Sequence, residues 1–422
     1  MYARISSTRG ELGPILRFAG GPEAEWPRGL FRTLRYTLLP MLTTPEAGTL
    51  RQLCKETKRE VEEHPWEDMG TVIRGYVGVK VGVSAGLKGA WRACFPRARG
   101  ANVASYMSQR NNPTGRLTPI VDSDLVHFAG LRMLNLSCCR CLTGAGFQHL
   151  RGIQSLTLRH CTQLRPAAFE HLGGIQRLDV RECVQLTDEV LPHLRGIHTL
   201  DMSGCPKITG VGFVHLRGIQ QLNMGRCSRV TGAAFEHLQG IHTLVMNGCS
   251  QDTITDAAFG HLRGVQVLNM GQCSQVTGAA FEHLRGIRTL DMSGCHQPTI
   301  TDEAFAHLEG IRVLKMSQIK ERGGGMGGLL PITNAAFAHL TGIHTLDMSG
   351  CRQPTITDEA FAHLRGIKVL DMRQCNQDTI TDAAFVHLRG ARVTVSSPSQ
   401  SRAALAYGCT VKSADDEDED AV

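Results

Sequence analysis

The sequence has 422 residues and a net charge of +6, and 42% of its residues are hydrophobic but only 5% are aromatic. This hydrophobic fraction suffices for a packed core, which must be mainly aliphatic with some phenylalanine. No apolar run approaches the roughly 18 residues of a membrane-spanning helix, and Met1–Gly20 lacks the apolar core of a signal peptide. We therefore expect a cytoplasmic or nuclear protein with no membrane partner.

The N-terminal third of the chain has three predicted parts. Residues 1–25 contain scattered Gly and Pro and are predicted to be disordered. Residues 26–68 have apolar residues at helical spacing, and Thr44-Pro45 is typical of a helix start. Residues 69–120 are predicted to form a linker and an N-terminal capping repeat, with a degenerate strand near 99–104.

Residues 26–68 resemble an F-box, a short helical module. The resemblance rests on Trp26-Pro27 before the first helix, Pro45 opening the second, Leu53-Cys54-Lys55 within it and Pro65-Trp66 at its end. The segment departs from the family pattern in two ways. The interval from Pro27 to Pro45 is longer than usual, and Pro40 falls near the end of the first helix. The resemblance implies binding to the linker subunit of a cullin–RING ubiquitin ligase. The contacts that it carries over are Leu34, Leu38, Leu39, Leu42, Pro45, Leu50 and Leu53.

The same segment has a second interpretation. The first repeat of a solenoid needs a cover over its exposed end, and residues 26–68 suit a helical cap. The two interpretations are compatible, because one segment can cover the first repeat and still bind a partner.

From residue 121 to residue 396 one unit recurs every 22 residues, or every 24 where Thr-Ile precedes the Thr-Asp pair. Apolar residues alternate in each copy, which predicts a half-buried strand. The Thr-Asp pair predicts a helix start, Phe and Leu three residues apart form its inward stripe, and Gly ends it. The eleven predicted strands centre on Leu134, Leu156, Leu178, Leu200, Leu222, Leu244, Leu268, Leu290, Leu314, Leu346 and Leu370.

Ile153, Leu156, Leu158 and Cys161 match the leucine-rich-repeat pattern L-x-x-L-x-L-x-x-N/C. The copies resemble the cysteine-containing subclass of these repeats, which in eukaryotes often follows an F-box. The resemblance implies an α/β solenoid, a horseshoe with a parallel sheet inside and short helices outside. Together with the F-box-like segment it implies the substrate-recognition adaptor of an SCF-type cullin–RING ubiquitin ligase. The alternative is a non-catalytic protein-interaction scaffold with no ligase link.

One cysteine recurs in each repeat. Stacked cysteines form a line, which cannot supply four tetrahedral zinc ligands, so we expect buried, reduced thiols and no metal or other cofactor. The ten positions are Cys139, Cys161, Cys183, Cys205, Cys227, Cys249, Cys273, Cys295, Cys351 and Cys375. A His column and an Arg column also follow the repeat. We interpret the His column mainly as packing at the helix ends and the Arg column mainly as helix-end electrostatics. A pH-sensing role for the His column and an acidic partner for the Arg column are the alternatives.

The residues flanking each central Leu should line the concave face, where one column is mainly Asp and Asn. The Arg and Lys residues that differ from this pattern are the predicted contacts for an unknown protein target. We do not expect a nucleic-acid partner. These residues are Arg159, Arg177, Arg181, Arg226, Lys315 and Arg373. No Ser/His/Asp or Cys/His set stands outside the repeat columns, so no catalytic residue and no enzyme activity are predicted.

Two segments lie outside the repeat pattern. The Gly-rich insertion at 320–331 lacks the Lys-Ser/Thr of a phosphate-binding loop and is predicted to be a surface loop. Residues 397–422 are predicted to be a disordered acidic tail.

Overall fold

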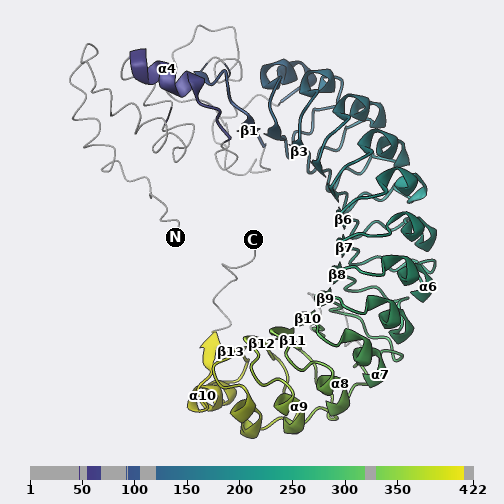
Figure 1. Cartoon of the computed structure of the whole chain (residues 1–422), viewed down its shortest axis with the longest axis vertical. Coiled ribbons are helices and arrows are strands. Elements are labelled where there is room, and N and C mark those ends of the chain that lie inside the picture. Colours follow the sequence, from purple (N-terminus) through teal and green to yellow (C-terminus); the bar gives the residue numbers. More distant parts are fainter. Residues whose placement is uncertain are drawn as a thin grey trace. The chain divides into compact units, whose positions relative to one another are not determined.

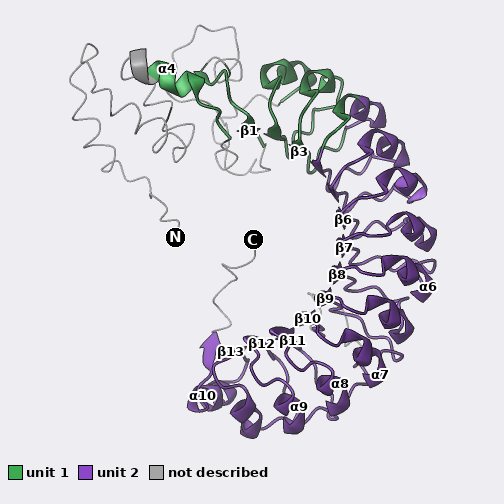
Figure 2. Cartoon of the chain, in the orientation of Figure 1, with its two compact units in different colours: residues 1–163, 171–175 green, residues 164–170, 176–422 purple. Residues whose placement is uncertain are grey.

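The computed structural model describes residues 55–67, 94–104, 120–318 and 329–412, together with Ala47 and Arg92. All seven predicted F-box contacts therefore lie outside the described residues, as does most of the Gly-rich insertion. The chain forms two compact units: unit 1 is residues 1–163 and 171–175, and unit 2 is residues 164–170 and 176–422 (Figure 2). No helix of the described residues is both long and apolar enough to span a bilayer.

The described residues form 14 strands of three residues each, ordered in the sheet as in the chain, and their pairing within each unit is parallel. Unit 1 contains β1 (Gly100–Asn102), β2 (Met133–Asn135) and β3 (Ser155–Thr157). Unit 2 contains β4 (Arg177–Asp179), β5 (Thr199–Asp201), β6 (Gln221–Asn223), β7 (Thr243–Val245), β8 (Val267–Asn269), β9 (Thr289–Asp291), β10 (Val313–Lys315), β11 (Thr345–Asp347), β12 (Val369–Asp371), β13 (Arg392–Thr394) and β14 (Thr410–Lys412).

The alternation of apolar and polar residues explains the strands. In β5, for example, Leu200 is buried while Thr199 and Asp201 are partly exposed, and Met202 just beyond the strand is buried again. Successive side chains of a strand point to opposite faces, so the Leu and Met side chains enter the core and their neighbours face outward. Each predicted strand centre is confirmed, and the fold is a leucine-rich-repeat solenoid.

In unit 2 the strands line the inner side of a curved stack, and the connecting helices lie on its outer side (Figure 1). The core between the two layers holds one Phe from each typical repeat, such as Phe235 and Phe259, whose ring centroids are 6.4 Å apart. Unit 1 contains α4 (Lys55–Glu63), η4 (Asp122–Phe128) and η5 (Phe147–Leu150), and η6 (Pro166–Leu172) contains residues of both units.

The helices of unit 2 are shorter and tighter than predicted, because most are 3₁₀ turns where the sequence suggested about two turns of α-helix. A 22-residue repeat leaves few residues for the outer layer, and 3₁₀ geometry suits such short pieces. The elements are η7 (Asp188–Leu194), η8 (Val211–Leu216), η9 (Gly232–His237), α6 (Asp256–Phe259), η10 (Gly260–Leu262), η11 (Gly278–Leu284), α7 (Asp302–Phe305), η12 (Ala306–Leu308), α8 (Asn334–Ala338), α9 (Asp358–Ala362), η13 (Asp382–His387) and α10 (Pro398–Ala406).

The N-terminal end of unit 1 is covered by Trp66. Its carbonyl accepts hydrogen bonds from the N–H groups of Arg99 and Gly100 at 2.6 and 2.9 Å, and its indole N–H donates to the carbonyl of Val61 at 2.7 Å. The buried indole also packs edge-on against Phe95, with ring centroids 5.6 Å apart. The end of the F-box-like segment is therefore part of the cover over the first strand.

The C-terminal prediction was wrong in its boundary. Residues 397–412 were expected in a disordered tail, but they form α10 and β14, and β14 pairs with β13. This last repeat contains no Phe, and its helix starts at Ser397-Pro398 where the others have Thr-Asp or a related pair. Without the repeat signature its sequence does not indicate a repeat, although Ala403 and Ala404 are buried.

Candidate interaction surface

The cysteine column supports the turns that follow the strands. The thiols of Cys205, Cys227 and Cys273 are buried and donate to the carbonyls of the preceding repeat at 3.2 to 3.3 Å. Burial raises the pKa of Cys205 to about 12, so it stays protonated at neutral pH. The fourteen described cysteines are all free thiols, and the ten of the repeat column are buried as predicted.

The Asp of four Thr-Asp pairs (Asp188, Asp256, Asp302 and Asp358) reaches the following repeat, a role beyond the helix start that the sequence suggested. The carboxylate of Asp188 accepts from both the backbone N–H and the hydroxyl of Thr209 at 2.9 Å. Asp256 and Asp358 hold Thr277 and Thr381 in the same way at 2.6 to 2.7 Å. These carboxylates are occupied by the fold and are not candidates for acid–base chemistry.

The Asp and Asn side chains on the inner face of unit 2 form ordered pairs. The Oδ1 atoms of Asp201 and Asp291 each accept from the N–H two residues later at 3.0 Å, which fixes the carboxylate locally. Their Oδ2 atoms accept from the amides of Asn223 and Asn269 at 2.9 and 3.1 Å. Val245 lies on β7 between the two pairs and interrupts the column.

Two of the predicted cationic contacts are neutralised by this column. Arg181 lies 2.5 Å from Asp201 and 3.8 Å from Asp179, and Arg373 lies 2.6 Å from Asp371. Arg177 and Arg226 are exposed but lie two strands apart, on β4 and after β6. Arg159 is exposed after β3 in unit 1. The six predicted residues therefore do not converge on one point.

Lys315 differs from the other predicted cations. It is exposed on β10, in register with Asp291 of β9 and Asp347 of β11, yet it forms no ion pair with any described residue. Its ammonium group is thus available to a partner, while Asp291 and Asp347 beside it accept hydrogen bonds from Asn269 and Ser349.

The sequence reasoning missed the environment of Asp347. The hydroxyl of Ser349, only 2% exposed, donates to Asp347 Oδ1 at 2.6 Å and lies 2.8 Å from the Ser317 hydroxyl. Burial raises the pKa of Asp347, although the hydrogen bonds from Ser349 oppose this effect. Ser317 and Ser349, near the one Lys in the column, were the features of the sequence that could have indicated this environment. We call Asp291, Lys315, Asp347, Asp371 and Arg373 the mixed-charge patch.

This surface is suited to binding, since its polar groups are arranged as a charge pattern on an open sheet face. Among the described residues, no group of three or more His, Cys, Asp or Glu is placed to hold a metal ion. The mixed-charge patch alternates in sign along β9–β11, and Asp371 of β12 pairs with Arg373, a pattern that a polypeptide with both charges can match.

No protein-family model matches the sequence, and no curated protein matches it. Among solved structures, the fold is similar to that in the Drosophila Toll–Spätzle complex (15% identity, TM-score 0.48, 70% of this chain and 49% of that chain). It is also similar to the TLR13–ssRNA13 complex (14%, 0.47, 75% and 55%) and to the yeast Rad7–Elc1 complex (14%, 0.39, 69% and 83%). The chain thus spans about half the length of the first two. Likenesses this distant say nothing about partners or activity.

Proposed function

We propose that this chain is a protein-binding solenoid that acts as the substrate-recognition adaptor of a cullin–RING ubiquitin ligase. In this proposal the inner face of unit 2 holds the target, and residues 26–68 bind the linker subunit of the ligase. The mixed-charge patch is the contact centre on the inner face.

The observation that supports the binding function is that Lys315 is exposed and forms no ion pair among the described residues. It stands between two in-register carboxylates, and the lack of an ion pair leaves its charge open on the sheet face. The neighbouring Ser317 and Ser349 are small, so a partner side chain meets no bulky residue there. Charge complementarity of this kind determines partner choice and association rate more than affinity.

The ligase link is supported by the resemblance of residues 26–68 to an F-box. A specific observation favours the scaffold alternative, because Trp66 at the end of this segment is built into the cover of unit 1. The two roles are compatible if the leucine face upstream of α4 remains available.

One affinity-purification experiment separates these functions. Leu38→Asp is expected to abolish co-purification of the linker subunit while leaving the target bound, because a charge on an apolar binding face prevents its burial. Lys315→Glu is expected to have the opposite effect, with loss of the target and retention of the linker subunit. Leu405→Asp is the matched control, since Leu405 is 59% exposed on α10 and its variant should keep both.

Two outcomes would contradict the proposal in different ways. If the wild-type chain does not bind the purified linker subunit, the segment is a cap and the scaffold function replaces the adaptor function. If Lys315→Glu retains every protein that the wild type retains, the inner face is not the target site. Circular dichroism of each variant shows whether the solenoid remains folded.

A further inference from the structure

The residue that precedes each strand forms a continuous column along one edge of unit 2. Its backbone N–H donates to the carbonyl of the equivalent residue in the preceding repeat, for example Arg312 to Arg288 at 2.9 Å and Lys368 to His344 at 2.9 Å. The last four members before the buried Ala391 are consecutive neighbours and all are exposed. They are Arg288, Arg312, His344 and Lys368.

A second set of cations lies three residues earlier in the same turns. Arg285 occupies the second position of a β-turn closed by a 3.0 Å hydrogen bond from the Ile287 N–H to the Leu284 carbonyl, and Gly286 has the positive φ of +84° that this turn requires. Arg365 and Arg389 occupy the same place in their repeats. We define the basic edge as these three residues with Arg288, Arg312 and Lys368.

The cations of the basic edge lack carboxylate partners nearby. In the part of the chain that the structure describes, Arg285, Arg288, Arg312, Lys368 and Arg389 form no ion pair. The one carboxylate in the same turns is Glu309, which contacts His339 at 3.2 Å. Like charges on neighbouring strands, about 4.8 Å apart, destabilise a sheet.

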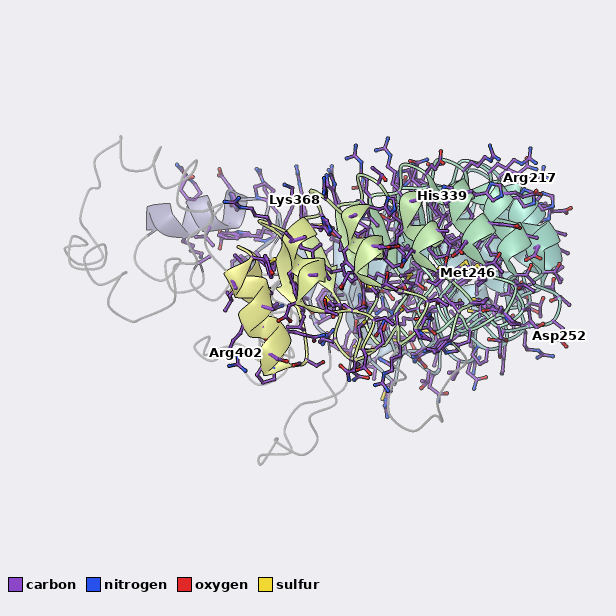
Figure 3. All side chains as sticks on the ribbon, turned by 90° about the horizontal axis from the view of Figure 1, so that it is seen from below. Arg217, Met246, Asp252, His339, Lys368 and Arg402 are labelled. Carbon is purple, nitrogen blue, oxygen red and sulfur yellow. The ribbon has the colours of Figure 1, made fainter. Side chains whose placement is uncertain are left out.

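The fold itself does not require these charges. At the same column position, the repeats of β6 and β8 have Gln220 and Gln266, and their backbone hydrogen bonds of 3.0 to 3.1 Å are the same. Arg217, His339 and Lys368 lie along one edge of the unit, and Asp252 and Arg402 lie toward the opposite edge (Figure 3).

We propose that the basic edge is a second binding site, which takes an acidic polypeptide segment rich in Asp and Glu. Each guanidinium can hold a carboxylate through two hydrogen bonds, and bound carboxylates offset the repulsion between neighbouring cations. The site lies at the N-terminal ends of the strands, apart from the mixed-charge patch, so both can be occupied together.

The shape and composition of the edge favour a polypeptide over nucleic acid. Unit 2 is curved (Figure 2), and bending a DNA duplex, with a persistence length of about 150 base pairs, along that curve would cost energy. Single strands bind through successive aromatic side chains that stack on bases. Among the large exposed hydrophobic residues described, Tyr407 is the one aromatic, too few for such a platform. An extended acidic segment bends freely and needs no aromatic partner.

The test measures binding of a fluorescein-labelled polyglutamate peptide to the full chain by fluorescence anisotropy. The triple variant Arg288→Gln/Arg312→Gln/Lys368→Gln places at each position the residue found at 220 and 266, so the fold should be retained. It should bind the peptide about tenfold or more weakly, because several exposed ion pairs are lost together. Added salt should weaken wild-type binding strongly.

The matched control is Lys207→Gln/Arg229→Gln/Arg402→Gln, which removes the same charge from exposed residues outside the basic edge and should bind like the wild type. The acidic residues 415–420 are present in every protein compared, so any competition from them is equal. Equal weakening in both triple variants, or no wild-type binding, overturns the proposal. If single-stranded RNA or duplex DNA binds more tightly than the peptide and depends on the basic edge, the site is a nucleic-acid site instead.

Discussion

At the scale of single residues, the cysteine column shows how a polar group is accommodated in a packed turn. Cys249 is 1% exposed and donates to the Met224 carbonyl at 3.3 Å, and burial raises the pKa of its thiol from 9.0 to about 11. The thiol satisfies a backbone acceptor and remains uncharged, which a carboxylate at this position cannot do. Hydrogen bonding and size therefore determine which residues can occupy the position.

The pKa of Cys249 gives a prediction on alkaline stability. Between pH 9 and pH 11 the thiol ionises in the unfolded chain but not in the folded one, so its contribution to stability falls as pH rises. Cys249→Ser removes this titration. The variant should be about 1 kcal/mol less stable than wild type at about pH 8, and that difference should shrink at about pH 10. Urea unfolding at both pH values measures it, and a difference that grows with pH would refute the assignment.

At the scale of elements, several repeats are held to the next by an Asp–Thr contact as well as by the strands. Asn334 stands in the Asp place in one repeat, and its amide still accepts from the Thr357 N–H at 2.9 Å and donates to the Thr357 hydroxyl at 2.8 Å. The contact thus depends on hydrogen-bond geometry and not on a negative charge.

This internal substitution predicts the effects of two variants. Asp256→Asn should change the free energy of unfolding by less than about 0.5 kcal/mol, because Asn can make both hydrogen bonds to Thr277. Asp256→Ala should cost about 1–3 kcal/mol, since the part-buried Thr277 N–H and hydroxyl lose their partner. Urea unfolding of both variants checks this. Equal losses would mean that the charge of Asp256 matters after all.

The sequence predicted those features of the elements that follow from side-chain pattern. Alternation around Leu200 and its equivalents predicted the centres of β2 to β12, since one face of each strand must be buried. Features that depend on backbone hydrogen bonds were missed, among them the 3₁₀ form of η7 and the last repeat, which contains no Phe. The basic edge was seen only in part, because its column becomes continuous only when backbone pairing brings residues 24 apart, such as Arg288 and Arg312, side by side.

At the scale of the whole molecule, unit 2 is a stack in which each repeat contacts its neighbours and few others. Within it the strand pairs follow chain order, and the core Phe side chains also stack in that order. Stability in such a stack is close to a sum of repeat and nearest-neighbour contributions. A destabilising substitution in one repeat should therefore affect mainly that repeat and its neighbours. The same change in a globular core would affect the whole domain.

Phe281 tests this idea, because it is fully buried in η11 near the middle of unit 2. Phe281→Ala should lower the free energy of unfolding by about 3–5 kcal/mol, the usual loss for a truncated core Phe. Hydrogen exchange should then lose protection first at β8, β9 and β10, while β5 and β13 keep theirs, because coupling decays beyond adjacent repeats. Leu405→Ala at the exposed surface is the control and should change neither. Equal loss of protection from β4 to β14 would show that unit 2 unfolds as one cooperative body, and the nearest-neighbour description would then fail.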